Sequence, residues 1–431
     1  ATIEPRPAVL ILADTSEALQ AGQGVAGEDR WLRELVWRSP GVVFVLLGRD
    51  SLSWAEREDS PARRWHAIVE EHRLGRLEAD EVEAILRGYP VTEADVRAVI
   101  REGADGLPFY VGVQLDIYRD LADESIEPRP EHFASTPGQV LERFRSHVGE
   151  RLQNSLRTLA FARSFDAGLL AYLKAQPGHL VGEVLLADLA RFSFVEALAE
   201  GRYRLHQHYR DVECRETARH APEHARTIHA ALFAYWDERC GPAEVLDVTL
   251  AHENALREAA HHKLALGAEP AIGWLAARWW VFFQATRLSL ARGLWAEYLR
   301  AADAELGPEH AAVAVTLGNL GIVLERLDAL SEARAAQERA LRINERVYGP
   351  EHAEVAVTLG NLGNVLFRLD ALSEARAAQE RALAIFERVL PAEHSYCVKV
   401  LENLALTVER QGETARASTF RAEAERRQAG R

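Results

Sequence analysis

Cysteine is scarce in this chain of 431 residues, which has only three: Cys214, Cys240 and Cys397. Their wide separation excludes a disulfide framework and a cluster of closely spaced metal ligands. A chain without disulfides suits a reducing compartment, so we expect a cytoplasmic protein. Methionine is absent altogether, even at position 1, and for that reason we expect a fragment, an engineered form or an incomplete transcript.

Long apolar runs are absent too. No stretch approaches the roughly 20 apolar residues that a membrane-spanning helix needs. The opening residues, Ala1 to Pro7, have charges and prolines where a signal peptide would have its apolar core. We therefore expect no contact with a membrane.

Positive charge is in short supply. The chain has 51 Lys and Arg against 65 Asp and Glu, which gives a formal net charge of −14 and a pI near 5.7. This balance opposes attraction to a phosphate backbone, so a nucleic acid partner is not expected. Nearly all of the basic residues are arginine, and lysine occurs only at Lys174, Lys263 and Lys399.

Several catalytic motifs are missing. The chain has no Gly-x-x-x-x-Gly-Lys-Ser/Thr and no lysine before Lys174, so these residues contain no phosphate-cradling P-loop. Gly-x-Ser-x-Gly, His-Glu-x-x-His and Cys-x-x-Cys do not occur either. The adjacent His261 and His262 are predicted to lie on a solvated helix face rather than to bind a metal.

An internal repeat dominates the C-terminal part. Residues 307–348 and 349–390 form two adjoining copies that differ at only six positions, and a degenerate third copy follows in the same register. Each copy predicts two helices, Val313–Leu327 and Leu330–Arg346 in the first. An i, i+3, i+7 pattern of apolar residues predicts the buried face of the first helix in each copy. These residues are Leu317, Leu320 and Leu324, then Leu359, Leu362 and Leu366, then Leu401, Leu404 and Val408.

The N-terminal part predicts a different structure. Two short apolar runs, Val9–Asp14 and Gly41–Arg49, flank an amphipathic helix around Asp29–Trp37. Strands that are apolar throughout indicate a parallel sheet covered on both faces. Asp14 and Arg49 follow such strands, where α/β folds bind their ligands. Between these ends of the chain, residues 219–300 predict helices whose many aromatic residues pack in a core.

The repeats resemble tetratricopeptide repeats of the long, kinesin-light-chain type over about residues 301–427. This resemblance implies an α-solenoid that holds a protein or peptide in the groove lined by the first helices. Asn319, Asn361 and Asn403 occupy equivalent positions and would pair with the backbone of an extended peptide. Two of the six differences, Ile322/Asn364 and Glu325/Phe367, also fall on the first helices. We call these residues the first-helix face: Asn319, Ile322, Glu325, Asn361, Asn364, Phe367 and Asn403.

Residues 8–218 resemble the STAND class of signalling ATPases. The resemblance implies that Asp14 is a Walker B acid that holds Mg²⁺, with Glu17 as a second acid and Arg49 as a sensor of the γ-phosphate. Pro108, in Gly106-Leu107-Pro108, would contact the adenine of ATP or ADP. His206 would contact the β-phosphate, although the usual Leu-His-Asp reads Leu205-His206-Gln207.

The same resemblance implies a winged-helix domain after the nucleotide-binding part. Leu156–Leu173 and Gly182–Ala199 would provide its helices, and Arg202–His206 its wing strand. The family places its P-loop before the Walker B strand, so we expect that loop upstream of Ala1. A chain without it is expected to be inactive as an ATPase alone.

We therefore predict a mainly α chain with four parts: a partial α/β nucleotide-binding domain (1–135), a winged helix (136–218), a helical connector of irregular repeats (219–300) and an α-solenoid (301–431). The expected function is a nucleotide-regulated signalling switch whose repeats bind a protein partner and which forms a homo-oligomer when activated. The alternative is a non-enzymatic scaffold whose α/β part is structural. A winged-helix DNA binder is disfavoured by the negative charge.

Overall fold

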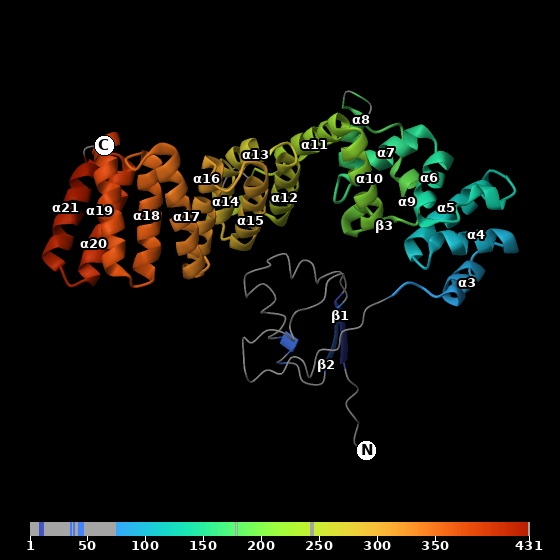
Figure 1. Ribbon diagram of the computed structural model, residues 1–431, viewed down its shortest axis with the longest axis horizontal. Coiled ribbons are helices and arrows are strands. Elements are labelled where there is room, and N and C mark those ends of the chain that lie inside the picture. Colours follow the sequence, from blue (N-terminus) through green and yellow to red (C-terminus); the bar gives the residue numbers. More distant parts are fainter. Residues whose placement is uncertain are drawn as a thin grey trace, which may run out of the picture. The chain divides into compact units, whose positions relative to one another are not determined.

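The computed structural model describes residues 8–12, 35–36, 38, 42–46, 75–176, 178, 180–241 and 245–429. The chain forms two compact units, residues 1–76 and 77–431. Helices predominate among the described residues, as the ribbon in Figure 1 shows.

The first unit contains the two predicted strands. β1 (Ala8–Leu12) and β2 (Val42–Leu46) pair in parallel, with Ala8 opposite Val42 and Leu12 opposite Leu46. Parallel pairing of sequential strands requires a crossover connection, and the described residues 35, 36 and 38 in that connection are helical. The apolar runs thus predicted both the strands and their relative direction.

The second unit begins with four helices, α3 (Ala79–Arg87), α4 (Ala94–Ala104), α5 (Pro108–Asp123) and α6 (Pro137–His147). Asp105 and Gly106 connect α4 to α5 in left-handed conformations, with φ of 46° and 72°. Pro108 then begins α5, where proline suits the first helical position because the backbone N–H there has no partner within the helix.

The next segment contains short elements: α7 (Glu150–Ala160), α8 (Ala167–Lys174), α9 (Leu186–Ala190), β3 (Val195–Ala197), β4 (Tyr203–Leu205) and α10 (Gln207–His220). β3 and β4 form an antiparallel hairpin, and β4 coincides with the strand expected at Arg202–His206. The helical interpretation of Leu156–Leu173 was wrong in part, because the chain leaves the helix at Phe161 and the Asp166 carboxylate caps a new one. Gly182–Ala199 likewise contains only the short α9, followed by a strand.

Aromatic residues fill the core of the following helices, α11 (Pro222–Asp237), α12 (Leu250–Leu264), α13 (Ala268–Ala276), α14 (Trp279–Gln284) and α15 (Leu288–Glu305). Trp274, Trp279, Phe282, Phe283 and Trp295 are buried, as expected for core packing, whereas Trp280 is 47% exposed. His262, predicted to lie on a solvated face, is fully buried between α11 and α12.

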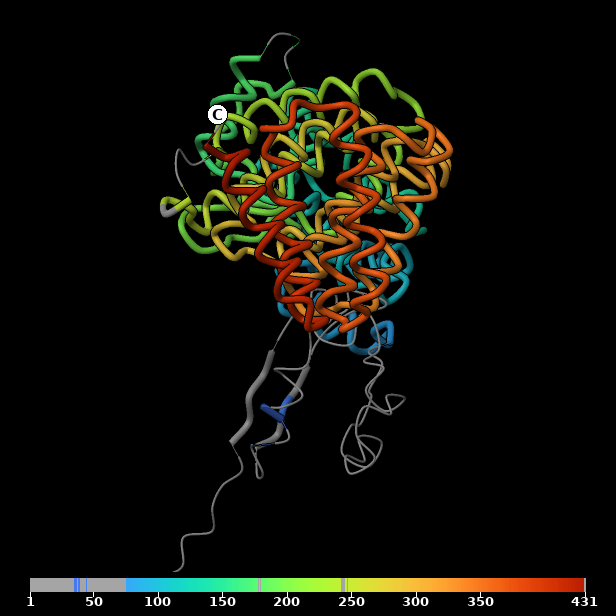
Figure 2. The backbone as a smooth tube through the Cα atoms, turned by 90° about the vertical axis from the view of Figure 1, so that its left-hand side faces the viewer, coloured from blue at the N-terminus to red at the C-terminus, as the bar shows by residue number. Residues whose placement is uncertain are grey.

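Six helices form the repeats: α16 (Ala311–Arg326), α17 (Leu330–Tyr348), α18 (Ala353–Arg368), α19 (Leu372–Val389), α20 (Ser395–Arg410) and α21 (Thr414–Ala429). Consecutive helices pack side by side, and the tubes of α18 to α21 run alongside one another in Figure 2. The apolar stripe is buried in all three copies, as the pattern predicted.

The turn between the two helices of a repeat recurs upstream, in the segment where irregular repeats were expected (219–300). Asp328 and Asp370 adopt left-handed conformations with φ of 62°. Gly412, at the equivalent position of the third copy, has φ of 89°. Thr286, one repeat length before Asp328, also has φ of 62° and connects α14 to α15. The pair α14 and α15 therefore has the same turn as the recognised repeats.

Ion pairs recur between neighbouring repeats at the repeat spacing. Arg339 pairs with Asp303 at 2.6 Å, and the equivalent Arg381 pairs with Glu345 at 2.7 Å. All four side chains are partly exposed, so each pair contributes at most about 1 kcal/mol. The apolar stripe, rather than these ion pairs, accounts for most of the packing energy.

Candidate functional site

The first-helix face lies on α16, α18 and α20. All seven of its residues are half-buried, so their side chains contact the fold and still present atoms to the surface. Ile322 packs against the apolar core below it, and Phe367 does the same one repeat later. The face therefore offers apolar and polar groups on a rigid helical frame.

The asparagines of this face are not equivalent in their contacts. Asn403 donates from Nδ2 to Oδ1 of Asn364, at 2.8 Å, so its amide is used within the chain. Among the described residues, Asn319 and Asn361 form no side-chain hydrogen bond. The amide contact between Asn403 and Asn364 joins two different positions of neighbouring repeats.

An arginine from the following repeat contacts the residue at the variable position Glu325/Phe367. Arg410 lies over the Phe367 ring, 5.1 Å from its centroid, and Arg368 donates to the backbone oxygen of Glu325. Burial raises the pKa of the Glu325 carboxyl. An arginine at one position thus accommodates either an aromatic ring or a carboxylate at its partner position.

Sequence reasoning missed that this arrangement extends upstream. Arg326 lies over Phe283, 5.4 Å from the ring centroid, and Phe283 stacks on the exposed Trp280 with centroids 5.0 Å apart. Phe283 stands one repeat length before Glu325, and Trp280 stands one repeat length before Ile322. The signal that could have revealed this was the register of the turn at Thr286, because α14 itself is too short to show a helical pattern.

The helix start at Pro108 and the imidazole of His206 lie close together. Pro108 is exposed, and the ring of its neighbour Phe109 stacks on His206, with centroids 5.0 Å and planes 28° apart. The hydroxyl of Tyr110 lies 2.8 Å from Nε2 of His208, whose pKa is lowered by burial. Two residues almost one hundred positions apart are thus brought to one place by α5 and by the start of α10.

The His206 side chain has a structural contact of its own. Its Nδ1 accepts a hydrogen bond from the backbone N–H of His208 at 3.2 Å and so caps α10. In the neutral ring the proton is then on Nε2. His310, His352 and His394 cap α16, α18 and α20 in the same way, with Nδ1 to N distances of 3.2, 3.2 and 3.3 Å.

The remaining predicted nucleotide residues, Asp14, Glu17 and Arg49, lie outside the described residues. The site within the described residues therefore contains Pro108 and His206 but none of these three residues. In the part of the chain that the structure describes, no group of three or more His, Cys, Asp or Glu side chains could hold a metal ion. Nor is any described helix long and apolar enough to cross a bilayer.

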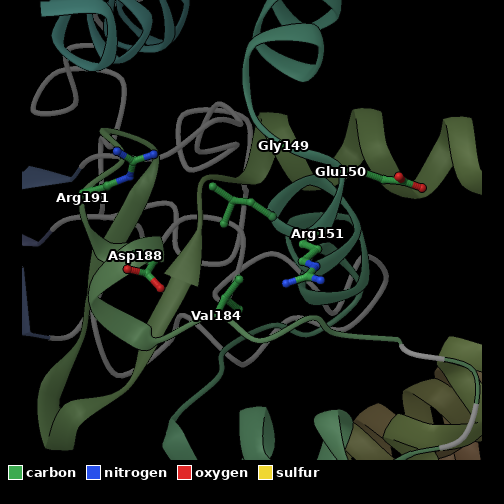
Figure 3. A pocket seen from close by; sticks show the side chains of 7 residues that line it. Gly149, Glu150, Arg151, Val184, Asp188 and Arg191 are labelled. Atoms are coloured by element: carbon green, nitrogen blue, oxygen red, sulfur yellow. The ribbon is translucent and has the colours of Figure 1, made fainter. Parts of the chain in front are cut away.

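A separate cavity of about 600 Å³ lies between the start of α7 and α9, and contains none of the predicted residues. Figure 3 shows its lining residues, among them Arg151, Asp188 and Arg191. Arg191 already binds the carboxylate of Asp120 through two hydrogen bonds of 2.8 and 3.1 Å. Asp188 accepts a hydrogen bond from the backbone N–H of Leu185 at 2.7 Å. These two charged groups are thus occupied within the fold.

The tetratricopeptide repeat family model matches residues 281–346, 326–388 and 354–428. The C-terminal region therefore consists of tetratricopeptide repeats, and the match begins at the α14 and α15 pair identified from the turn. No curated protein matches the chain.

Among solved structures, the chain is similar to BtubC (BKLC) from P. vanneervenii, with 20% identity and a TM-score of 0.39 over 51% of this chain and 87% of that one. Another is a putative kinesin light chain with nearly identical repeats from Podosopora anserina, with 15% identity and a TM-score of 0.32 over 50% and 92%. A third is a STAND protein with a tetratricopeptide repeat sensor from Pyrococcus horikoshii, with 13% identity and a TM-score of 0.36 over 98% and 68%.

Proposed function

We propose that the chain is part of a cytoplasmic, nucleotide-regulated signalling switch, and that its repeats bind a protein or peptide partner through the first-helix face. Tetratricopeptide repeats generally bind protein partners. The proposal adds two points to this: the surface that binds the partner, and the regulation by a nucleotide. The surface is supported by residues of the repeats, and the switch by residues around His206.

One observation carries the surface proposal. The two nearly identical repeats keep the buried stripe unchanged, but they differ at Ile322/Asn364 and Glu325/Phe367, which are half-buried positions on the first helices. Differences at such positions alter the chemistry that a partner meets, while the packing of the frame is retained. The two repeats thus offer different contacts on the same frame.

The amides of Asn319 and Asn361 supply the second element of this surface. A carboxamide can donate to a backbone C=O and accept from a backbone N–H, which suits an extended peptide. Because the amide of Asn403 is bound to Asn364, we assign the peptide contacts to Asn319 and Asn361 first.

For the switch, the ligand would be ATP or ADP with Mg²⁺. Asp14 would hold the metal ion, Glu17 and Arg49 would lie near the γ-phosphate, and Pro108 would contact the adenine. The stack of Phe109 on His206 supports a shared site for Pro108 and His206. A P-loop in a segment before Ala1 is required. Partner binding would then shift an equilibrium between a closed state and a homo-oligomer.

The second candidate function is a non-enzymatic scaffold. It is favoured by the histidine caps, since His206 caps α10 with the same geometry that His310, His352 and His394 show in the repeats. A helix cap alone explains His206 without a nucleotide. Sequence upstream of Ala1 separates the two functions: Gly-Lys-Ser/Thr at the end of a strand supports the switch, and a continuous upstream sequence without it supports the scaffold.

The surface proposal is tested on an array of extended peptides. Asn319→Ala with Asn361→Ala should weaken binding of every captured peptide by about 1–3 kcal/mol per lost amide, because buried peptide groups are left without partners. The melting curve should be unchanged. Asn344→Ala is the matched control for a buried asparagine that donates to Thr358 within the fold, and it should lower the melting temperature instead. Full peptide binding by the double variant would contradict the assignment.

A further inference from the structure

Helices α11 and α12 connect two separate apolar cores. Ile228 and Leu232 of α11 belong to the core of the preceding helices, whereas Leu256 and Ala259 of α12 belong to the core that continues into the repeats. The two helices lie beside each other in Figure 1 and pack extensively. Their interface is therefore the place where the two cores are mechanically joined.

This interface contains an unusual concentration of titratable side chains, which we call the histidine junction: His229, Glu258, His261 and His262. The three imidazole rings lie with centroids 5.1 to 6.1 Å apart. His262 is fully buried, and its Nδ1 lies 3.0 Å from Nδ1 of His229. At this distance one nitrogen must carry a proton and the other must accept it.

The hydrogen bonding of the junction is incomplete. Nε2 of His262 and Oε2 of Glu258 are buried, and within the described part of the chain neither atom has a hydrogen-bond partner. They lie 3.9 Å apart, too far for a hydrogen bond. Buried polar groups without partners are costly, and apolar residues would fill the interface at lower cost. The polar groups of the junction thus stabilise the interface less than apolar residues would, and they can gain or lose protons.

The charges around the junction oppose protonation. Arg163 faces it from the segment after α7, with Nε 3.8 Å from Glu258 Oε1, and Arg210 of α10 donates to the backbone oxygen of Ala160 beside it. Two uncharged neighbours also border the junction: the Phe161 ring contacts His229, and the Tyr298 hydroxyl of α15 donates to the backbone oxygen of Ala260. Glu258 is the only acid in the group, and burial raises the pKa of its carboxyl.

We propose that the histidine junction is an acid-sensitive joint, in which protonation of the imidazoles separates α11 from α12 and uncouples the two cores. A first proton added to His262 leaves the hydrogen bond between its Nδ1 and Nδ1 of His229 in place. Further protons place like charges beside Arg163 and Arg210 in a dry interface, and only the entry of water relieves them. The inference does not depend on the proposed partner or nucleotide.

The direction of the pH dependence follows from burial. Burial lowers the pKa of His229 and of His261 to about 4, and it lowers the pKa of His262 well below its ordinary value. Once the helices separate, the imidazoles regain ordinary values near 6.5. The contribution of the junction to stability is therefore complete above about pH 6.5 and is lost as the pH falls toward 4.

The experiment is hydrogen exchange of the full chain, followed by mass spectrometry at pH 7.5 and 5.5 and corrected for intrinsic exchange rates. Each histidine whose pKa rises from about 4 to about 6.5 on opening should increase the population of the open interface about tenfold over this range. Peptides from residues 222–264 should lose protection accordingly, and peptides from 353–386 should change much less. Equal protection of 222–264 at both pH values would overturn the proposal.

Two further measurements keep the test decisive. His229→Leu with His262→Leu should abolish most of the pH dependence of residues 222–264, while His220→Gln, at an exposed histidine of α10, should leave it intact. If the double variant does not fold, exchange at the imidazole C2 position of the native chain reports the titration directly. Half-titration of His229 and His262 below about pH 5 supports the joint, and half-titration near 6.5 overturns it.

Discussion

At the scale of single residues, the histidine before each first helix has a role that its chemistry explains. His310, His352 and His394 recur at the repeat spacing, and each Nδ1 accepts a backbone N–H at the start of its helix. Histidine is not among the usual capping residues, which are Ser, Thr, Asp and Asn. Only the deprotonated Nδ1 can serve, because an imidazolium has no acceptor and places positive charge at the positive end of the helix dipole.

The cap leads to a prediction at His352. His352→Ala should lower the free energy of unfolding by about 1 kcal/mol, since the N–H of Glu354 loses its partner. His352→Asn should restore it. Urea unfolding of both variants at pH 7.5 measures the effect, and the asparagine variant should match the native chain in stability. Equal stability of the alanine variant and the native chain at pH 7.5 would show that the cap contributes nothing to the free energy of unfolding.

At the scale of elements, glycines within the first helices have different constraints. A Cβ built on Gly363 would lie 2.7 Å from Cγ of Gln379, so the close approach of α18 and α19 requires glycine there. A Cβ on Gly360 would meet only Cγ2 of Val400 at 3.9 Å, which is ordinary contact. Internal packing therefore explains the glycine at one position and leaves the other unexplained.

These two positions form a matched pair for mutation. Gly360→Ala should stabilise the chain by up to about 1 kcal/mol, because alanine is the better helix former. Gly363→Ala should destabilise it, because helix propensity cannot offset the displacement of a buried glutamine. Thermal unfolding of both variants decides the matter, and destabilisation by Gly360→Ala would mean that the helix is packed more tightly there than the structure indicates.

The accuracy of sequence-based prediction also varied by element. The repeats were predictable because their first helices are long and have apolar residues at helical spacing. The same residues are the ones that pack in the core. The segment from Phe161 to Ala199 was not, since its helices are short and a single cap at Asp166 decides where α8 begins. His262 was misjudged because its burial comes from α11, which no local pattern reveals. For the first-helix face the sequence indicated the positions, but the bond between Asn403 and Asn364 depends on how neighbouring repeats meet.

At the scale of the whole molecule, the absence of Gly-x-x-x-x-Gly-Lys-Ser/Thr governs the expected chemistry. Phosphoryl transfer depends on a lysine and backbone N–H groups that neutralise the phosphates. The purified chain should therefore hydrolyse ATP no faster than the buffer alone. A release assay for inorganic phosphate checks this, and turnover by the chain that Asp14→Asn abolishes would refute it.

The central claim is that the first-helix face selects the partner, and exchanging the chemistry of one repeat for that of the other tests it most directly. Asn364→Ile with Phe367→Glu gives the second repeat the face of the first, and Arg410 can then meet a carboxylate as Arg368 meets Glu325. The measurement compares binding of a peptide array to this variant and to the native chain. We predict a changed set of bound peptides with a similar melting temperature. An identical binding profile, together with unchanged melting, would contradict the claim and point to another surface of the repeats.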